Sequence, residues 1–443
     1  MKGTMNNIET ISKTVNSIVW GPAILLFLIF VGIYFSIKFR FFQIWGIKEW
    51  LFGTIKGFFK KSENGKISSF QAVTTSLAGA IGTGNIVGVA TAITLGGPGA
   101  IFWMWIGAFL GMMTIFAENI LGGLYKQKNI NGEVVGGPMY YIEKGMGKKW
   151  LAIFFSIACI GSTLGMGNMT QSNSLAGALY EGFNINPKFT AIILGIIVTI
   201  IIFGGVSRIV SVSEKLVPFM AIFYITGGLA VIFINIDSMG KVFHDIFKDA
   251  FNFQSAGAGI IGIVTSKAIK YGIARGTFSN EAGLGSSPII YAAANVDDPK
   301  QQGMLGIFQV FFDTIIGCTI TAFCILCTGV TGSGEEGVAL STKAFETVFG
   351  NFGSYFVSIS IVLFSFSTIV GWSYFGQRAF EYIFGLKSVA IYKSIYIVAL
   401  LFGCVMNLNL VWELSDTFNG LMMIPNLIAL LVLSKQIVLV RAR

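Results

Sequence analysis

Charged residues and histidine are scarce in this 443-residue chain, which is 12% Asp, Glu, Lys and Arg and has a single histidine, His244. Soluble domains carry roughly 25% charged residues, and half of that proportion cannot cover a water-facing surface of this size. A water-soluble enzyme is therefore excluded, and the hydrophobic fraction of 54% excludes disorder. One histidine outside the apolar runs also excludes Ser-His and HExxH catalytic sites.

The chain also has few cysteines and lacks the sequence motifs of ATPases and of common ion channels. The five cysteines all lie in apolar runs, and the CxxC spacing of Cys324 and Cys327 lacks the partner residues of a metal or redox site. We interpret these cysteines as small packing residues. The phosphate-loop pattern GxxxxGK[ST], a TVGYG-type filter and an arginine-repeat voltage sensor do not occur, which excludes ATP hydrolysis and those channel types.

Long apolar runs are what the chain has in abundance, with a mean hydropathy of +0.75. A membrane-spanning helix needs about 20 predominantly apolar residues. Eleven runs qualify: 17–37, 69–95, 99–123, 150–179, 189–205, 214–235, 257–292, 303–330, 352–377, 388–406 and 414–435. We therefore expect an all-α polytopic membrane protein that forms a single transmembrane domain over residues 1–443.

The net charge of +9 comes from basic residues in short loops between the apolar runs. Seven of them lie between Lys38 and Lys66, directly after the first run. Because lysine and arginine collect on the cytoplasmic side, this predicts an outside N-terminus and a cytoplasmic C-terminus in the cell membrane. The same pattern argues against nucleic-acid binding. No small-residue cleavage site follows the first run, so we interpret it as an uncleaved span.

One segment outside the spans has its own pattern. In residues 236–256, Phe243, Phe247 and Phe251 recur every fourth residue, with charges between them. This predicts an amphipathic helix on the outer surface.

Two stretches of the chain resemble each other. Residues 78–85 read AGAIGTGN and residues 280–287 read NEAGLGSS, and each lies in the first span of a set of five. The sets are residues 69–235 and 257–435, with 17–37 as an extra N-terminal helix. Because five is odd, the two sets have opposite orientations, which predicts a 5+5 inverted repeat as in many secondary transporters.

Glycines at these places predict broken helices. A break frees backbone N–H and C=O groups, which is tolerable in a membrane only beside protein or a cavity. The N–H groups that begin the second half-helix suit a carboxylate, and the freed carbonyls can hold Na⁺ or an ammonium group. The alternative is that the glycines only allow close helix packing.

Two other spans carry polar faces. Asn168, Gln171 and Ser172 share one helical face. Ser365, Thr368 and Trp372 share another. These faces either line a substrate and ion cavity or form interhelical hydrogen bonds.

Few ionisable residues lie within spans, and those singled out here are Glu118, Lys267, Lys270, Arg275, Glu281 and Asp313. Such residues are costly in a bilayer and mark functional sites or ion pairs. We expect Glu281 or Asp313 to pair with Arg275.

Several motifs resemble one known family. Residues 96–106 read GGPGAIFWMWI, 84–86 read GNI, 136–140 read GGPMY, 276–283 read GTFSNEAG and 371–374 read GWSY. The chain resembles the alanine/glycine:cation symporters, also called sodium:alanine symporters, from about residue 15 to 435. The resemblance implies an eleven-span LeuT-type inverted-repeat fold and Na⁺-coupled uptake of alanine or glycine.

The resemblance also implies a substrate site and an ion site. It assigns Thr83, Gly84 and Asn85 to the substrate carboxylate, Gln171 to a hydrogen bond with the substrate, and Phe278 and Trp372 to closing a small pocket. By analogy with the fold, it assigns Na⁺ to the carbonyls of Ala78, Ile81 and Phe364 and the hydroxyls of Ser367 and Thr368. Hard oxygen ligands of this kind suit Na⁺ rather than a transition metal.

The sequence therefore predicts a secondary active transporter, not an enzyme, that brings small neutral amino acids into the cell with Na⁺ by alternating access. Its partners would be the amino acid, the co-transported Na⁺ and membrane lipid, with no nucleic acid and no obligatory protein partner evident. An H⁺-coupled symporter and an uncoupled facilitator of the same substrates remain as alternatives. An intramembrane enzyme would need a convergent acid–base or metal cluster, which the sequence does not contain.

Overall fold

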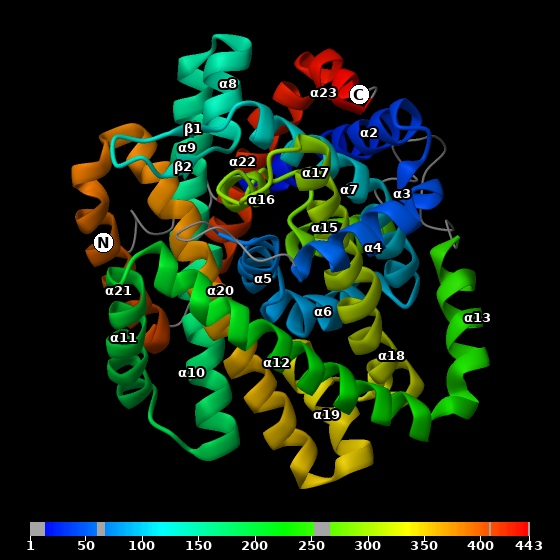
Figure 1. Cartoon of the computed structure of the whole chain (residues 1–443). Coiled ribbons are helices and arrows are strands. Elements are labelled where there is room, and N and C mark those ends of the chain that lie inside the picture. The colour runs from blue at the N-terminus through cyan, green and yellow to red at the C-terminus, as the bar shows by residue number, and fades with distance from the viewer. Residues whose placement is uncertain (1–13, 60–66, 252–265, 407–408, 442–443) are drawn as a thin grey trace.

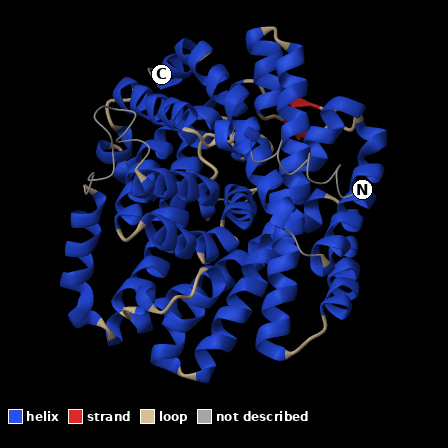
Figure 2. Ribbon diagram, turned by 180° about the vertical axis from the view of Figure 1, so that it is seen from behind, coloured by secondary structure: helices blue, strands red, loops and turns tan. Residues whose placement is uncertain are grey.

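The chain is helical almost throughout. The computed structural model describes residues 14–59, 67–251, 266–406 and 409–441. Within these residues the only sheet is a two-stranded antiparallel hairpin of β1 (Gln127–Lys128) and β2 (Val134–Val135), the small red element in Figure 2. The prediction of an all-α protein is confirmed.

Eight helices among the described residues are long and apolar enough to cross a membrane. They are Thr14–Lys38, Gly99–Leu124, Lys149–Phe183, Val206–Ile234, Pro299–Cys327, Asn351–Phe384, Leu386–Val405 and Val411–Val432. Each matches one of the runs identified in the sequence.

The predicted number of eleven spans is not confirmed by length and composition. A ninth candidate is a helix pair, Ser69–Ala80 with Thr83–Gly96, bent by 61° at the break between them. Pro187–Phe203 is apolar but has 17 residues, about three short of a full crossing. The expected span 257–292 corresponds to two shorter helices, and its residues 257–265 lie outside the described part of the chain.

The helices have the following bounds in the first half of the chain: α2 Pro22–Lys38, α3 Phe42–Trp45, α4 Ile47–Phe58, α5 Ser69–Ala80, η1 Thr83–Asn85, α6 Val87–Gly96, α7 Gly99–Leu124, α8 Pro138–Met146, α9 Lys149–Leu164, η2 Gly165–Met169, α10 Thr170–Phe183, α11 Pro187–Phe203 and α12 Val206–Ile234. In the second half they are η3 Ile236–Ser238, α13 Met239–Ala250, α15 Lys267–Asn280, α16 Ser287–Tyr291, α17 Pro299–Val310, η4 Phe311–Cys318, α18 Thr319–Cys327, η5 Val330–Gly332, α19 Gly337–Phe349, α20 Asn351–Phe384, η6 Leu386–Ser388, α21 Val389–Val405, α22 Asn409–Val432 and α23 Ser434–Arg441. Two of these segments, η2 and η4, are π-helical stretches inside long spans, a feature often found at functional sites.

The interrupted helices lie in the middle of the molecule. Figure 1 shows α5, α6 and α15 at its centre, with the long helices around them. Helix α15 packs on α6 and α7, while α12 and α20 pack on α5. The chain breaks are therefore enclosed by protein, as freed backbone groups in a membrane require.

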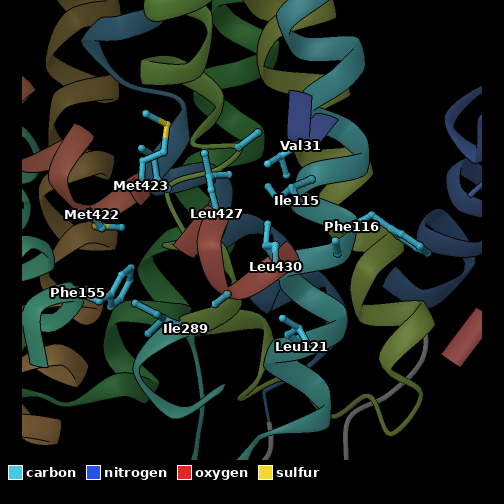
Figure 3. Close-up of a cluster of buried hydrophobic side chains, with 14 of the residues drawn as sticks. Val31, Ile115, Phe116, Leu121, Phe155, Ile289, Met422, Met423, Leu427 and Leu430 are labelled. Atoms are coloured by element: carbon cyan, nitrogen blue, oxygen red, sulfur yellow. The ribbon is translucent and has the colours of Figure 1, made fainter. Parts of the chain in front are cut away.

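The largest apolar core joins the N-terminal span to both halves of the chain. Figure 3 shows side chains from α2, α7, α9, α16 and α22 meeting in one cluster, with Val31, Phe116 and Leu430 among them. These three side chains are completely buried. Close packing stabilises helix association inside a membrane through van der Waals contacts, so the extra N-terminal helix is an integral part of the fold.

Large apolar residues also cover part of the outer surface. On α11, Ile192, Ile196 and Ile200 recur every fourth residue and are 56–58% exposed. A stripe of this kind would be a liability in water, whereas in a membrane it faces lipid.

The segment with the phenylalanine pattern forms the amphipathic helix α13. Phe243, Phe247 and Phe251 are each at least 40% exposed, and Phe247 and Phe251 also pack against Phe102 of α7. The predicted helix is confirmed, and its placement on the outer surface stays a prediction.

The contact between the start of α7 and the end of α13 explains the glycines of the GGPGA motif. The Gly99 amide, at the start of α7, donates to the Asp249 carboxylate of α13 at 2.8 Å. A Cβ at Gly99 would lie 2.4 Å from the backbone nitrogen of Ala250, and Gly97 has a φ of +76°. Glycine at these positions therefore lets α13 approach closely enough for Asp249 to cap α7.

Candidate functional site

The break between α5 and η1 gathers five oxygen atoms. The Ser367 hydroxyl of α20 lies 2.8 Å from the carbonyl oxygen of Phe364 and 3.4 Å from those of Ala78 and Ile81. The Thr368 hydroxyl lies 3.0 Å from the Phe364 oxygen and 3.4 Å from the Ile81 oxygen. The five groups that the fold analogy assigned to an ion are therefore adjacent, although they belong to two helices nearly 300 residues apart.

The local backbone explains why these carbonyls are available. Helix α5 ends at Ala80, and Ile81 turns away with φ −74° and ψ 93°. The Gly82 amide, which would bond the Ala78 carbonyl in a continuing helix, instead donates to the Asn85 side-chain oxygen at 3.0 Å. A Cβ at Gly82 would lie 2.5 Å from the Thr368 hydroxyl oxygen, so glycine keeps this space open.

A cavity of about 210 Å³ begins directly beyond this break. Its lining consists of Thr83, Gly84, Val87, Gly88, Thr91, Arg275, Phe278 and Trp412. Three of the six predicted substrate residues, Thr83, Gly84 and Phe278, therefore border one space. The Thr83 hydroxyl is buried without a hydrogen-bond partner among the described residues.

The other three predicted substrate residues do not line that cavity. The Gln171 side-chain oxygen accepts from the Thr83 amide at 3.4 Å, which places it beside the break. The Trp372 indole is fully buried and donates to the Gly79 carbonyl at 3.2 Å. Asn85 bonds within the protein, so its amide holds the turn together.

Asp313 is the centre of a hydrogen-bonded cluster beside the break, which the sequence did not predict. Asp313 lies in the π-helical segment η4, completely buried, and accepts from Asn85 at 2.8 Å and from Ser279 at 3.2 Å. These contacts join the two broken helices to α17–η4–α18. The only sequence signal was a carboxylate in an apolar run.

The prediction that Arg275 pairs with Glu281 or Asp313 is wrong. Its guanidinium lies 3.5 Å from the Asp416 carboxylate of α22, because α15 turns its basic face toward α22 and the N-terminal span. Glu281 instead accepts from Ser286, at the second break. Glu118 accepts from Asn426 at 2.5 Å. One oxygen of each glutamate is buried without a hydrogen-bond partner among the described residues.

A comparison with protein families shows which family this chain belongs to. The model of the sodium:alanine symporter family matches residues 5–442. The chain belongs to the sodium:alanine symporter family. The sodium/alanine symporter AgcS of Methanococcus maripaludis is 42% identical over 434 residues, which is 96% of this chain and 95% of that protein. The probable sodium/glutamine symporter GlnT of Bacillus subtilis is 40% identical over 97% of this chain and 89% of that protein.

Solved structures show the fold. MhsT, in complex with L-phenylalanine, superposes with a TM-score of 0.57 at 15% identity, over 84% of this chain and 90% of that chain. A manganese transporter of Eremococcus coleocola superposes with a TM-score of 0.57 at 12% identity, over 82% of this chain and 75% of that chain. The fold is therefore LeuT-like.

Family membership and the apolar helices show that this chain is a multi-pass membrane protein. It is a cation-coupled amino-acid symporter and not an enzyme. The related proteins carry the names of different amino acids, alanine and glutamine. The amino acid and the ion for this chain are therefore matters for the proposal below.

Proposed function

We propose that the chain carries alanine or glycine into the cell together with Na⁺, by alternating access in the cell membrane. In this proposal it has eleven spans, with residues 17–37 added to a 5+5 inverted repeat of residues 69–235 and 257–435. The N-terminus lies outside and the C-terminus in the cytoplasm, as the distribution of loop charges favours.

The convergence of five oxygens at the first break is the observation that carries the proposal. Three carbonyls and two hydroxyls, without sulfur or imidazole, form the kind of ligand set that hard cations prefer. The carbonyls are fixed by the break and the hydroxyls by α20. An ion there would tie α5 to α20, so its binding would favour one arrangement of the two helices over another.

The cavity beside the break suits a small zwitterion. An amino acid carries a carboxylate and an ammonium group, and a half-helix that begins at Thr83 directs backbone N–H groups toward the carboxylate. The Phe278 ring lies about 3.5 Å from where a Cβ of Gly84 would be. Phe278 therefore forms one wall of the cavity beside the break, and the choice of alanine and glycine follows the family resemblance.

The energy available from one ion is sufficient for concentrative uptake. Inward movement of one charge supplies about 2.3 kcal/mol per 100 mV, and a tenfold Na⁺ gradient adds about 1.4 kcal/mol. The sum of about 3.7 kcal/mol corresponds to an accumulation of about 500-fold. No ATP-hydrolysing motif is needed for this function.

Proton coupling is the second candidate, and buried carboxylates favour it. Asp313 and Glu281 are completely buried and have no basic partner among the described residues. Either could exchange a proton in place of a Na⁺ ion. Asp313 lies next to the proposed substrate residue Asn85.

Uptake of labelled alanine into proteoliposomes tests the proposal. An inward Na⁺ gradient is compared with a K⁺ gradient, each with and without a pH gradient. We expect accumulation above equilibrium with the Na⁺ gradient alone. Accumulation with a pH gradient alone would establish proton coupling instead, and equilibration without accumulation would establish a facilitator.

A further inference from the structure

The segment that joins the N-terminal span to the first broken helix forms two short helices of its own. They are α3 (Phe42–Trp45) and α4 (Ile47–Phe58), labelled in Figure 1. Arg40 and Phe41, between α2 and α3, have positive φ angles of 52° and 54°. Such angles are uncommon for residues other than glycine, and they turn the chain, so α3 and α4 are not a continuation of the span.

One face of α4 packs against the helices that form the transport site. The buried Trp50 ring lies 5.5 Å from the Phe311 ring of η4, and the Phe58 ring lies 5.3 Å from the Phe70 ring of α5, measured between ring centres. Segment η4 carries Asp313, and α5 leads to the first break. The position of α4 is therefore linked to both elements.

The opposite face of α4 exposes large apolar side chains. Phe52, Ile55 and Phe59 follow one another at spacings of three and four residues, which places them on one helical face. Trp45, at the end of α3, is exposed next to this face. The exposed fractions are 81% for Trp45, 56% for Phe52, 36% for Ile55 and 84% for Phe59. A row of this kind is a liability in water and is typical of a helix that lies in a membrane interface.

The same segment is cationic. Its exposed basic residues are Lys38, Arg40, Lys48 and Lys56. Among the residues that the structure describes, no ion pair involves any of these four. The one acid between residues 38 and 59 is Glu49, which pairs with Lys300 of α17 at 2.7 Å. The positive charges are therefore available to a partner, and the Glu49 pair fastens α4 to α17.

These two properties together select an anionic lipid surface. A neutral lipid would cover the aromatic side chains but would leave the four positive charges without counter-charge. An acidic protein or a nucleic acid would meet the charges but would leave Trp45 and Phe59 in water. An anionic lipid supplies acyl chains for the apolar face and phosphate groups for the basic residues. The predicted orientation puts this segment on the cytoplasmic side.

We propose that α3 and α4 form a docking surface for the anionic phospholipids of the cytoplasmic leaflet, and that docking speeds transport. The effect on transport rests on the proposed function, whereas the lipid surface itself does not. Lipid bound to the exposed face holds α4 in place. Because the buried face of α4 contacts α5 and η4, bound lipid also steadies the helix that leads to the ion site and the segment that carries Asp313.

Quenching of Trp45 fluorescence by brominated lipid tests the docking. The full chain is placed in phosphatidylcholine vesicles that contain either brominated phosphatidylglycerol or the same fraction of brominated phosphatidylcholine. The Trp45 signal is the part of the quenching that is lost in Trp45→Phe. Each basic residue near an anionic surface strengthens binding about fivefold. We therefore expect wild-type Trp45 to be quenched at least about threefold more by the anionic lipid.

A double variant and a charge-matched control show which residues are responsible. Lys48→Gln combined with Lys56→Gln should reduce the preference for phosphatidylglycerol to less than about half of the wild-type value. Lys128→Gln combined with Lys148→Gln removes the same charge from exposed lysines of other segments on the predicted cytoplasmic side. This control should keep the wild-type preference.

Alanine uptake at saturating Na⁺ and alanine provides the second readout, because saturation removes any effect of the vesicle charge on the local Na⁺ concentration. Phosphatidylglycerol should speed uptake at least about threefold in wild type and in the control, and should have no effect in the double variant of Lys48 and Lys56. Equal quenching of wild-type Trp45 by both lipids, with equal uptake rates, would overturn the docking surface and leave the symporter standing. Preferential quenching without Na⁺-dependent uptake in either lipid would overturn the proposed function and leave the docking surface standing.

Discussion

Removal of one hydroxyl from the five-oxygen group is the sharpest perturbation of the proposed ion site. Thr368 is completely buried, and its hydroxyl lies 3.0 Å from the Phe364 carbonyl oxygen and 3.4 Å from that of Ile81. Thr368→Val keeps the shape of the side chain and removes the oxygen. Polar contacts to a charged group contribute about 1.5–3 kcal/mol, so the half-saturating Na⁺ concentration should rise about 10- to 100-fold.

The assay is the Na⁺ dependence of alanine uptake in proteoliposomes. Thr368→Ser retains the hydroxyl and should stay close to wild type, whereas Ser367→Ala should resemble Thr368→Val. Ser360→Ala is the matched control: Ser360 is buried on the same helix, and its hydroxyl bonds the Phe356 carbonyl at 2.8 Å, outside the group. Its Na⁺ dependence should be unchanged.

Coupling adds a second signature to the Thr368 experiment. If Na⁺ and alanine favour the same conformation, each tightens the binding of the other by the same factor. Thr368→Val should therefore raise the half-saturating alanine concentration at low Na⁺ and restore it at saturating Na⁺. Unchanged Na⁺ dependence in both Thr368→Val and Ser367→Ala would refute the ion site.

Three further predictions concern glycines and a helix cap. Gly82→Ala should raise the Na⁺ requirement, because the new Cβ would lie 2.5 Å from the Thr368 hydroxyl oxygen; Na⁺-activated uptake measures it, and a wild-type requirement would contradict it. Asp249→Ala should lower stability by about 1 kcal/mol through loss of the cap on α7, with Asp249→Asn less affected; thermal unfolding in detergent measures both. Gly99→Ala should destabilise more than Asp249→Ala, because its Cβ meets the backbone of Ala250 at 2.4 Å, and an equal melting temperature would contradict that contact.

Much of the architecture follows from hydrophobicity and glycine. The long apolar runs correspond to helices, and the GTG stretch at residues 82–84 lies at the bend between two helical halves. These features are local, because apolar length predicts a span and glycine permits a break. Span number is harder, because Pro187–Phe203 is shorter than a full crossing.

The pairing of charges could not be predicted from the sequence. Arg275 is close in sequence to Glu281 and shares the membrane region with Asp313, yet it pairs with Asp416, 141 residues away. Which face of α15 meets α22 depends on the packing of the N-terminal span, where Trp20 bonds the Asp416 backbone. Such tertiary choices leave no periodic signal in the chain.

Asp313 illustrates a second limit. A single carboxylate in an apolar run indicates a functional residue, but its partners Asn85 and Ser279 come from two other helices. Its position beside the break depends on the π-helical turn in η4, and an extra residue in one turn cannot be recognised from a hydrophobic pattern.

Simultaneous measurement of alanine and Na⁺ movement tests the central claim most directly. Proteoliposomes without a Na⁺ gradient are given an inward alanine gradient, and the entry of radioactive Na⁺ is followed together with labelled alanine. The proposed symport predicts that alanine alone drives Na⁺ into the vesicles, and that Thr368→Val suppresses this flux at low Na⁺. Alanine entry with no accompanying Na⁺ would contradict it.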